Sequence, residues 1–254
     1  MYFILKFCAF YKVFSGHEWL EASIRSVFQY VEKVIISSSE LSWGGVGNNT
    51  CIKVVEELMR IIPNIDLIKC NTTDQKSQCE EGYRYIRDKY GPDYIMLVDS
   101  DEIWTDDAMA KAKRHIQFHQ NYPAYRCNMF TYIKDKHYRV EPYEPLQPVV
   151  FIKSDVDYYG DDARCCGIKP FYRMEDVFIH HFPYVRNNFT DILIKLINSH
   201  ISEKQEHEPL DYWVSEKWCK LPDVKDFHPA IGFQNNWHSI KVVDDGDLPE
   251  VLHG

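Results

Sequence analysis

The sequence predicts an α/β protein built on a mixed, mainly parallel β-sheet flanked by helices, followed by a loop-rich and helical C-terminal part. Apolar, strand-like segments alternate with amphipathic helical segments over residues 1–121. Helical connections between successive strands favour parallel pairing with right-handed crossovers. The chain has 254 residues, 45% of them hydrophobic and 26% charged, which is enough for one sizeable core and ordinary for a soluble globular protein.

Four strands are predicted in the first half, over residues 3–11, 33–37, 65–70 and 94–98. The helices between them are indicated by apolar side chains at spacings of three and four residues. We predict these helices over residues 17–30, 50–62 and 76–90. Pro63-Asn64 ends the second helix and Gly91-Pro92 ends the third, while a loop with three glycines covers residues 38–49.

The regular alternation fades after residue 121. Thr105 can cap a helix over residues 106–120, because its side chain can accept a hydrogen bond from the first turn. Strands are predicted over residues 124–132, 148–153 and 177–182, with a loop-rich stretch at 154–175. An amphipathic helix is predicted over 189–201, and one more near 211–219 in a tail rich in Pro and Trp.

Composition narrows the class of protein. The formal net charge of −9 argues against nonspecific binding of nucleic acid, which needs a basic surface. No apolar run of 18 residues occurs, so no transmembrane segment is expected. The apolar start of the chain is interrupted by Lys6 and Lys12 and does not resemble a signal peptide. Eight Cys without a Cys-x-x-Cys pair indicate reduced thiols rather than structural zinc, so we expect a cytoplasmic protein.

An acidic cluster, Asp99-Ser100-Asp101-Glu102, directly follows the predicted strand 94–98. Open α/β sheets bind ligands at the carboxyl ends of their strands. Two Asp one residue apart in a turn can direct carboxylate oxygens at one hard cation, and Mg²⁺ typically combines about one or two protein carboxylates with substrate phosphates. The spacing therefore predicts a site for a metal ion and a diphosphate.

Asp99-Ser100-Asp101 resembles the Asp-x-Asp motif of nucleotide-sugar glycosyltransferases with the GT-A fold, and three further segments resemble family 2 of these enzymes. Residues 17–27, HEWLEASIRSV, are similar to its Asn-Glu…Leu…Ser-Val helix, with His17 where Asn is usual. Residues 77–82 stand where that family has an Arg-Asn segment. Residues 180–186, HHFPYVR, resemble its His-aromatic-x-aromatic-Val-Arg segment. The resemblance covers roughly residues 1–200.

The resemblance implies a GT-A (Rossmann-like) fold and a metal-dependent glycosyltransferase. Such an enzyme moves a sugar from a nucleoside-diphosphate sugar to a glycan or other hydroxyl acceptor, with Mn²⁺ or Mg²⁺ on the diphosphate. It also implies three parts: residues 1–121 as the nucleotide-sugar-binding half, 122–202 as the acceptor-binding half of the same domain, and 203–254 as a C-terminal extension.

In this resemblance Asp101 coordinates the metal, and Asp99 binds the ribose, the metal or both. Glu102 orients the acceptor or supports the metal ligands. A late His often completes the metal shell, which points to His180 or His181. Adjacent residues of a strand face opposite sides, so at most one can reach the metal, and the motif favours His181. An imidazole ligand would favour Mn²⁺ over Mg²⁺.

The remaining candidates serve the nucleotide or the acceptor. Glu40 and Asp74, after the second and third strands, are nucleotide-side candidates, although Ser-Ser-Glu replaces the usual Asp at the first of these positions. Arg186 can pair with phosphate oxygens in bidentate geometry. An inverting enzyme needs a carboxylate to accept the acceptor proton, and Asp161-Asp162 is the nearest match to the family's acidic pair.

Two other functions remain open on the sequence. A sugar-phosphate nucleotidyltransferase would also hold a metal–phosphate complex beside a parallel sheet. It usually needs a Gly-rich, basic loop after the first strand, whereas residues 12–17 contain one Gly and one Lys. A catalytically silent relative that only binds a nucleotide or glycan is the second alternative, and the intact Asp-Ser-Asp argues against it. The stereochemical course, inverting or retaining, stays open.

Overall fold

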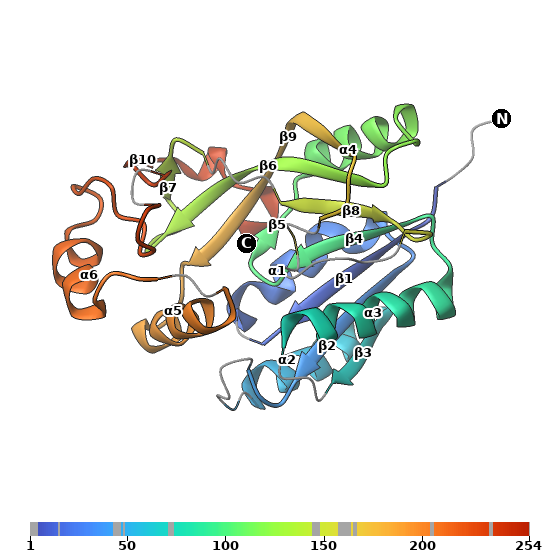
Figure 1. Ribbon diagram of the computed structural model, residues 1–254, viewed down its shortest axis with the longest axis horizontal. Coiled ribbons are helices and arrows are strands. Elements are labelled where there is room, and N and C mark those ends of the chain that lie inside the picture. Colours follow the sequence, from blue (N-terminus) through green and yellow to red (C-terminus); the bar gives the residue numbers. More distant parts are fainter. Residues whose placement is uncertain are drawn as a thin grey trace.

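The computed structural model describes residues 5–14, 16–42, 47, 49–70, 74–143, 148–156, 164, 167–203, 206–233 and 236–253, with only the backbone described at 49, 50 and 198–203. Its centre is a ten-stranded mixed sheet with the order β10-β7-β6-β8-β4-β1-β2-β3, and β9 pairs with β6 and β5 off this path (Figure 1). The α/β class with a mixed sheet flanked by helices is therefore confirmed.

The first half forms a parallel unit, as the alternation predicts. Its strands are β1 (Phe7–Val13), β2 (Lys33–Ser39), β3 (Ile65–Cys70) and β4 (Tyr94–Asp99), with β1 between β2 and β4. The connecting helices are α1 (His17–Val27), continued by a 3₁₀ turn at Phe28–Tyr30, α2 (Asn49–Ile61) and α3 (Gln75–Tyr90). Because these strands are parallel, their carboxyl ends share one edge of the sheet.

The second half extends the sheet with mostly antiparallel strands. These are β5 (Glu102–Ile103), β6 (Ala124–Ile133), β7 (Tyr138–Glu141), β8 (Val149–Lys153), β9 (Phe171–Tyr184) and β10 (Ser239–Val242). The prediction missed β5, β7 and β10, which are too short for a period-2 pattern. It also placed the start of β9 in a loop, because Arg173, Glu175 and Asp176 make that end of the strand polar and largely exposed.

The two faces of the parallel unit bury alternate residues of the same strands. On one face Ala9 and Tyr11 pack with α1, α2 and α4 (Asp106–Phe118). On the other face Cys8 and Phe10 pack against α3. Strand β1 is therefore central and buried on both faces except at the half-buried Lys12, and its carboxyl end lies beside that of β4.

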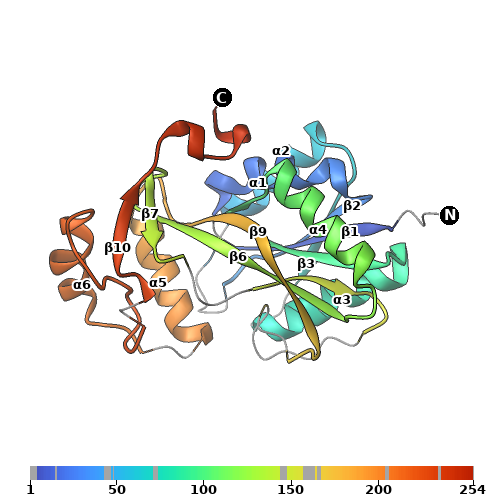
Figure 2. The same cartoon turned by 90° about the horizontal axis from the view of Figure 1, so that it is seen from above.

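The C-terminal part packs at the end of the sheet that β7 and β10 form (Figure 2). Helices α5 (Phe189–Glu203) and α6 (Leu210–Glu216) are followed by 3₁₀ turns at Trp218–Lys220, Asp245–Asp247 and Glu250–Leu252. Trp213 is buried in a separate core with Phe227 and donates its indole N–H to the Phe227 carbonyl at 2.9 Å. None of the helices in the described ranges is long and apolar enough to cross a membrane.

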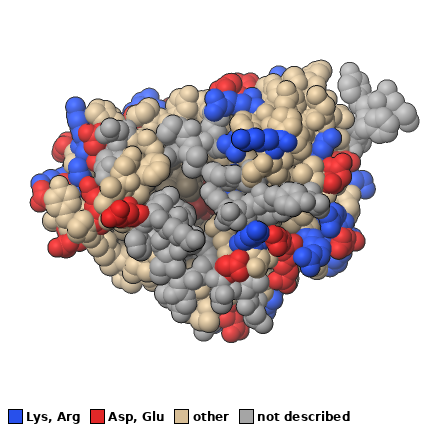
Figure 3. All heavy atoms as spheres, in the orientation of Figure 1, with Lys and Arg blue, Asp and Glu red and all other residues tan. Residues whose placement is uncertain are grey.

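Charged side chains of both signs are interspersed on the face that Figure 3 shows, with Lys and Arg lying beside Asp and Glu. Among the described residues of this face, cations and anions alternate and do not gather into a patch of one sign.

A close contact between α3 and β1 supports a stability prediction. A Cβ added at Gly82 would clash with the ring of Phe10, which is buried in β1. Because the added Cβ would overlap two atoms of that ring, we expect an overpacking cost of about 3 kcal/mol. After a helix-propensity gain of about 1 kcal/mol, Gly82→Ala should lower the free energy of unfolding by about 2 kcal/mol. Urea denaturation measures the change. Gly246→Ala, where an added Cβ meets nothing within 4 Å, is the control. Equal stability of G82A and the wild type would contradict this packing.

Candidate active site

The acidic cluster lies where β4 ends and the chain turns into β5. The Asp99 carboxylate is partly exposed, whereas Asp101 and Glu102 are buried. Strand β5 pairs with β9 so that Glu102 lies opposite His181, and the Phe182 N–H donates to the Asp101 carbonyl at 2.8 Å. This pairing brings the HHFPYVR segment, about 80 residues away in sequence, against the Asp-Ser-Asp turn.

Asp101 is surrounded by donors from β9, from the segment that follows β9, and from α5. Arg186 Nη2 lies 2.6 Å and Lys195 Nζ 2.9 Å from Asp101 Oδ2, and His181 Nε2 lies 3.4 Å from Oδ1. Arg186 also donates to the Pro183 carbonyl at 3.2 Å and lies 3.4 Å from Glu18 in α1. A single buried carboxylate therefore joins the turn after β4 to β9, α5 and, through Arg186, α1.

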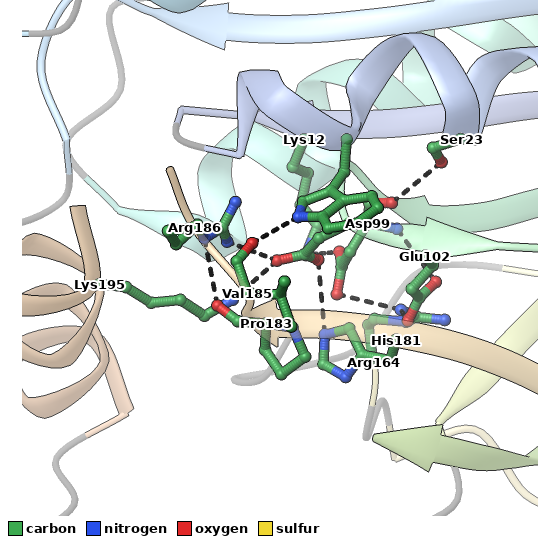
Figure 4. A network of polar contacts seen from close by, with 12 residues as sticks. Lys12, Ser23, Asp99, Glu102, Arg164, His181, Pro183, Val185, Arg186 and Lys195 are labelled. Carbon is green, nitrogen blue, oxygen red and sulfur yellow. Dashed lines mark hydrogen bonds and ion pairs between the residues drawn. The ribbon is translucent and has the colours of Figure 1, made fainter. Parts of the chain in front are cut away.

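A second group of charges surrounds Asp99 and Glu102 (Figure 4). Arg164 Nη1 donates to Asp99 Oδ2 at 3.0 Å and to Glu102 Oε1, while its other nitrogens reach the carbonyls of Leu97 and Val149. Lys12 Nζ, from the carboxyl end of β1, lies 3.8 Å from Asp99 Oδ1. Arg164 thus compensates two carboxylates and also binds the backbone of two neighbouring strands.

These contacts set the ionisation of the acids. Burial opposes ionisation of Asp99, but Arg164 and Lys12 lower its pKa to about 2. Burial also opposes ionisation of Asp101, and Lys195, His181 and Arg186 hold its pKa well below the usual range. At Glu102 burial prevails over Arg164, and the neighbouring Asp99 charge adds to it, so the pKa is raised. Asp99 and Asp101 are therefore anions at neutral pH.

The two adjacent histidines face opposite sides, as strand geometry predicts. His181 joins Asp101. His180 instead lies in the core, with Nδ1 at 2.9 Å from the Tyr132 hydroxyl, and burial together with Arg139 lowers its pKa to about 4. The prediction of His180 as a possible metal ligand is therefore corrected. Its ring packs against Tyr132 and Phe130, away from the acidic cluster.

Of the five other candidates, Arg186, Glu40 and Asp74 belong to the described residues. Arg186 joins the cluster through Asp101. Glu40 follows β2 at the same edge of the sheet and is exposed. Asp74 is exposed and caps α3 by accepting the Ser77 N–H at 2.8 Å, so its described role is structural. Asp161 and Asp162 lie outside the described residues, and their assignment as the base stays a prediction.

Three cations of the cluster, namely Lys12, Arg164 and Lys195, were not among the predicted site residues. Arg164 lies in a stretch whose sequence indicates only a loop. Lys195 lies in an amphipathic helix, where a Lys beside the apolar stripe ordinarily faces solvent. Lys12 lies near the carboxyl end of β1, at the ligand-binding edge of the sheet, and its position directly after the predicted strand 3–11 is the signal that could have identified it.

The fit of a divalent metal ion can be judged from the donors. Asp99, Asp101 and His181 supply suitable chemistry, because carboxylate and imidazole both bind Mn²⁺. In the described part of the chain, however, no three His, Cys, Asp or Glu side chains are grouped as a metal ion requires. Both carboxylate oxygens of Asp101 already have protein partners: His181 lies at Oδ1, and the cations Arg186 and Lys195 bind Oδ2. As arranged here, the side chains do not fit a metal ion.

The turn between β1 and α1 is tightly packed against this cluster. Gly16 precedes α1 with φ at +88°, in the left-handed region that favours glycine. A Cβ there would lie 2.6 Å from both Arg186 Nη1 and Ser100 Oγ. Trp19 in the first turn of α1 donates to the Val185 carbonyl at 2.5 Å and stacks on Phe182. The start of α1 and the end of β9 therefore fix the position of Arg186 together.

Comparisons with known proteins give limited information. No family model and no curated protein matches the chain. Solved structures that resemble it include S. aureus TarS 1-349, with a TM-score of 0.47 and 10% identity over 76% of this chain and 64% of that chain. The complex of S. aureus TarS 1-349 with UDP-GlcNAc has a TM-score of 0.48 and 8% identity, over 78% of this chain and 68% of that chain. The complex with UDP has a TM-score of 0.47 and 9% identity, over 78% of this chain and 65% of that chain. The chain thus spans about two thirds of the length of these structures, and a likeness at this level does not assign it to a family.

Arg164 is expected to be essential for folding stability. Replacing it by Met leaves Glu102 buried without its cation, so we expect Arg164→Met to lower the free energy of unfolding by about 3–5 kcal/mol at pH 7. Urea denaturation measures the loss. In the double variant R164M/E102Q no buried charge is stranded, and more than half of the loss should be recovered. A single variant as stable as the wild type would show that Arg164 does not hold Glu102.

His180 gives a pH dependence of stability. Its pKa is about 4 when folded and 6.5 when unfolded, so its contribution is complete above pH 6.5 and is lost as the pH falls toward 4. Between pH 7.5 and 5.0 we expect protonation of His180 in the unfolded state to lower the free energy of unfolding of the wild type by about 2 kcal/mol. His180→Asn should lose about 2 kcal/mol less than the wild type over that interval. Urea denaturation at both pH values tests this. His253→Asn, at an exposed residue, should follow the wild type; identical pH dependence of H180N and wild type would refute the assignment.

Proposed function

We propose that the chain is a glycosyltransferase that moves a sugar from a nucleoside-diphosphate sugar to an acceptor hydroxyl. One observation carries this proposal: Asp99 and Asp101 stand at the carboxyl edge of the parallel unit of the sheet, within a cluster of cations from β1, the segment that follows β9, and α5. Ligands of open α/β sheets bind at this edge. The GT-A resemblance of the Asp-Ser-Asp turn and the HHFPYVR segment supports it, because the structure joins these two segments at one place.

The chemistry of the proposed step explains why such a site needs cations. When the glycosidic bond to the diphosphate breaks, negative charge builds up on the departing phosphate oxygens. A cation near those oxygens binds the transition state more tightly than the ground state, and this difference lowers the barrier. Among the described residues, the cluster supplies the cations Lys12, Arg164, Arg186 and Lys195. The Mn²⁺ or Mg²⁺ expected from the sequence stays a prediction.

The partly exposed Asp99 is the carboxylate that a donor can reach most directly. Its anionic form at neutral pH can accept hydrogen bonds from ribose hydroxyls, as the resemblance implies. Asp101 is buried and positions Arg186 and Lys195, so its removal would disorganise both cations. The acceptor, the sugar and the base of the nucleotide are not defined by these residues.

Release of nucleotide from sugar donors tests the proposal. The protein is incubated with UDP-, GDP- and dTDP-sugars, in EDTA and again with Mn²⁺, and free nucleoside diphosphate is measured. We expect turnover with at least one donor and a loss of about 100-fold in Asp101→Asn, because both cations lose their anchor. Asp66→Asn is the control, since Asp66 forms ion pairs with Lys33 and Lys89 elsewhere in the fold. Thermal unfolding of both variants shows whether they are folded.

Two outcomes would contradict the proposal. Release of pyrophosphate from a nucleoside triphosphate and a sugar phosphate would identify a nucleotidyltransferase. Binding of nucleoside diphosphate without turnover, across donors and acceptors, would identify a protein that only binds its ligand.

A further inference from the structure

Asp101 has more positive partners than one carboxylate needs. Arg186 and Lys195 both bind its Oδ2 atom, at 2.6 and 2.9 Å, and His181 approaches Oδ1. Without Lys195, Asp101 would still have the full counter-charge of Arg186 on Oδ2 and His181 beside Oδ1. Lys195 is therefore the cation that Asp101 can release without leaving a buried charge uncompensated.

The two cations differ in how firmly they are held. The Arg186 side chain is 2% exposed and is fixed by Glu18, Pro183 and Asp101, in a space that Gly16 leaves just large enough. The Lys195 side chain is 25% exposed and extends from α5 toward the cluster, with its ammonium 5.6 Å from the centre of the Tyr184 ring (Figure 4). Arg186 is thus a fixed part of the site, and Lys195 has both access to solvent and a flexible four-carbon stem.

We propose that Lys195 is a diphosphate-binding residue of this site, which exchanges Asp101 for the phosphate oxygens of the bound nucleoside diphosphate. The inference rests on the proposed function and assigns to that reaction a residue outside the sequence motifs. A diphosphate carries more negative charge than a carboxylate and offers several acceptor oxygens to the three donors of an ammonium group. The exchange leaves Asp101 paired with Arg186, so no covalent step and no stranded charge is involved.

The alternative is that Lys195 serves only as a structural counter-ion of Asp101. Lys195→Met separates the two roles, because the methionine keeps the apolar stem beside Tyr184 but has no charge. Lys195→Arg restores a cation at the same place. Lys33→Met is the matched control, since Lys33 is 21% exposed and pairs with Asp66 at 2.8 Å at the opposite end of the parallel strands.

Isothermal titration calorimetry measures the dissociation constants of UDP, GDP, ADP and CDP, and then of the monophosphate of the tightest binder, in EDTA and in Mn²⁺. In the buffer where the wild type binds more tightly, we expect K195M to weaken diphosphate binding about tenfold or more. The affinity of K195M for the monophosphate should fall less than about threefold, because a monophosphate presents less negative charge to Lys195. K195R should recover part of the diphosphate affinity, and K33M should match the wild type.

The outcomes separate this inference from the function on which it rests. Wild-type affinity of K195M for the diphosphate, or an equal loss for diphosphate and monophosphate, would overturn the role of Lys195 and leave the proposed function standing. If the wild type binds no nucleoside diphosphate in either buffer, the proposed function fails, and this inference fails with it. Thermal unfolding of K195M close to that of the wild type would exclude a loss of fold as the cause.

Discussion

The compensation of buried negative charge at the end of β4 is the constraint on which the rest of this structure depends. Asp101 and Glu102 are almost completely buried, and an isolated carboxylate in such a place would be strongly unfavourable. Arg164, Arg186 and Lys195 satisfy them from segments that are 62 to 94 residues further along the chain. The acidic turn is therefore stable only when the segments that carry Arg164 and Arg186 are in place, which makes the cluster a link between the two halves of the sheet.

The same constraint explains the path of β9. Strand β9 pairs in parallel with β6 from Phe171 to Tyr184, and the other edge of its carboxyl end pairs antiparallel with the two-residue strand β5. That short pairing contributes few hydrogen bonds, but it sets His181 opposite Glu102 and delivers Arg186 to Asp101. Trp19 adds a second connection, since its indole binds the Val185 carbonyl and stacks on Phe182. Helix α1, the acidic turn and the HHFPYVR segment thus hold one another in place.

The sequence predicts the first half well because strong periodicity and clear breakers coincide there. Pro63, Gly91 and Thr105 bound helices where the structure has them, to within one or two residues. Strand alternation also separates His180 from His181. Arg164 could not be predicted, since a lone arginine in a loop has no local pattern that reveals a partner 65 residues away. Lys195 has the spacing of an ordinary helix-surface residue, and only the docking of α5 gives its ammonium a buried carboxylate.

The charges of the cluster are balanced by the chain alone, and this has a consequence for any anionic ligand. Asp99, Asp101, Glu102 and Glu18 face Lys12, Arg164, Arg186 and Lys195, so a diphosphate that enters must compete with protein carboxylates for its cations. The pairs that are most buried resist this competition, because breaking them strands a charge. The most exposed cation can change partners at the least cost. A site of this kind keeps its acidic turn stable without a ligand and still retains a cation that can bind phosphate, provided that the exchangeable cation is the one at the rim.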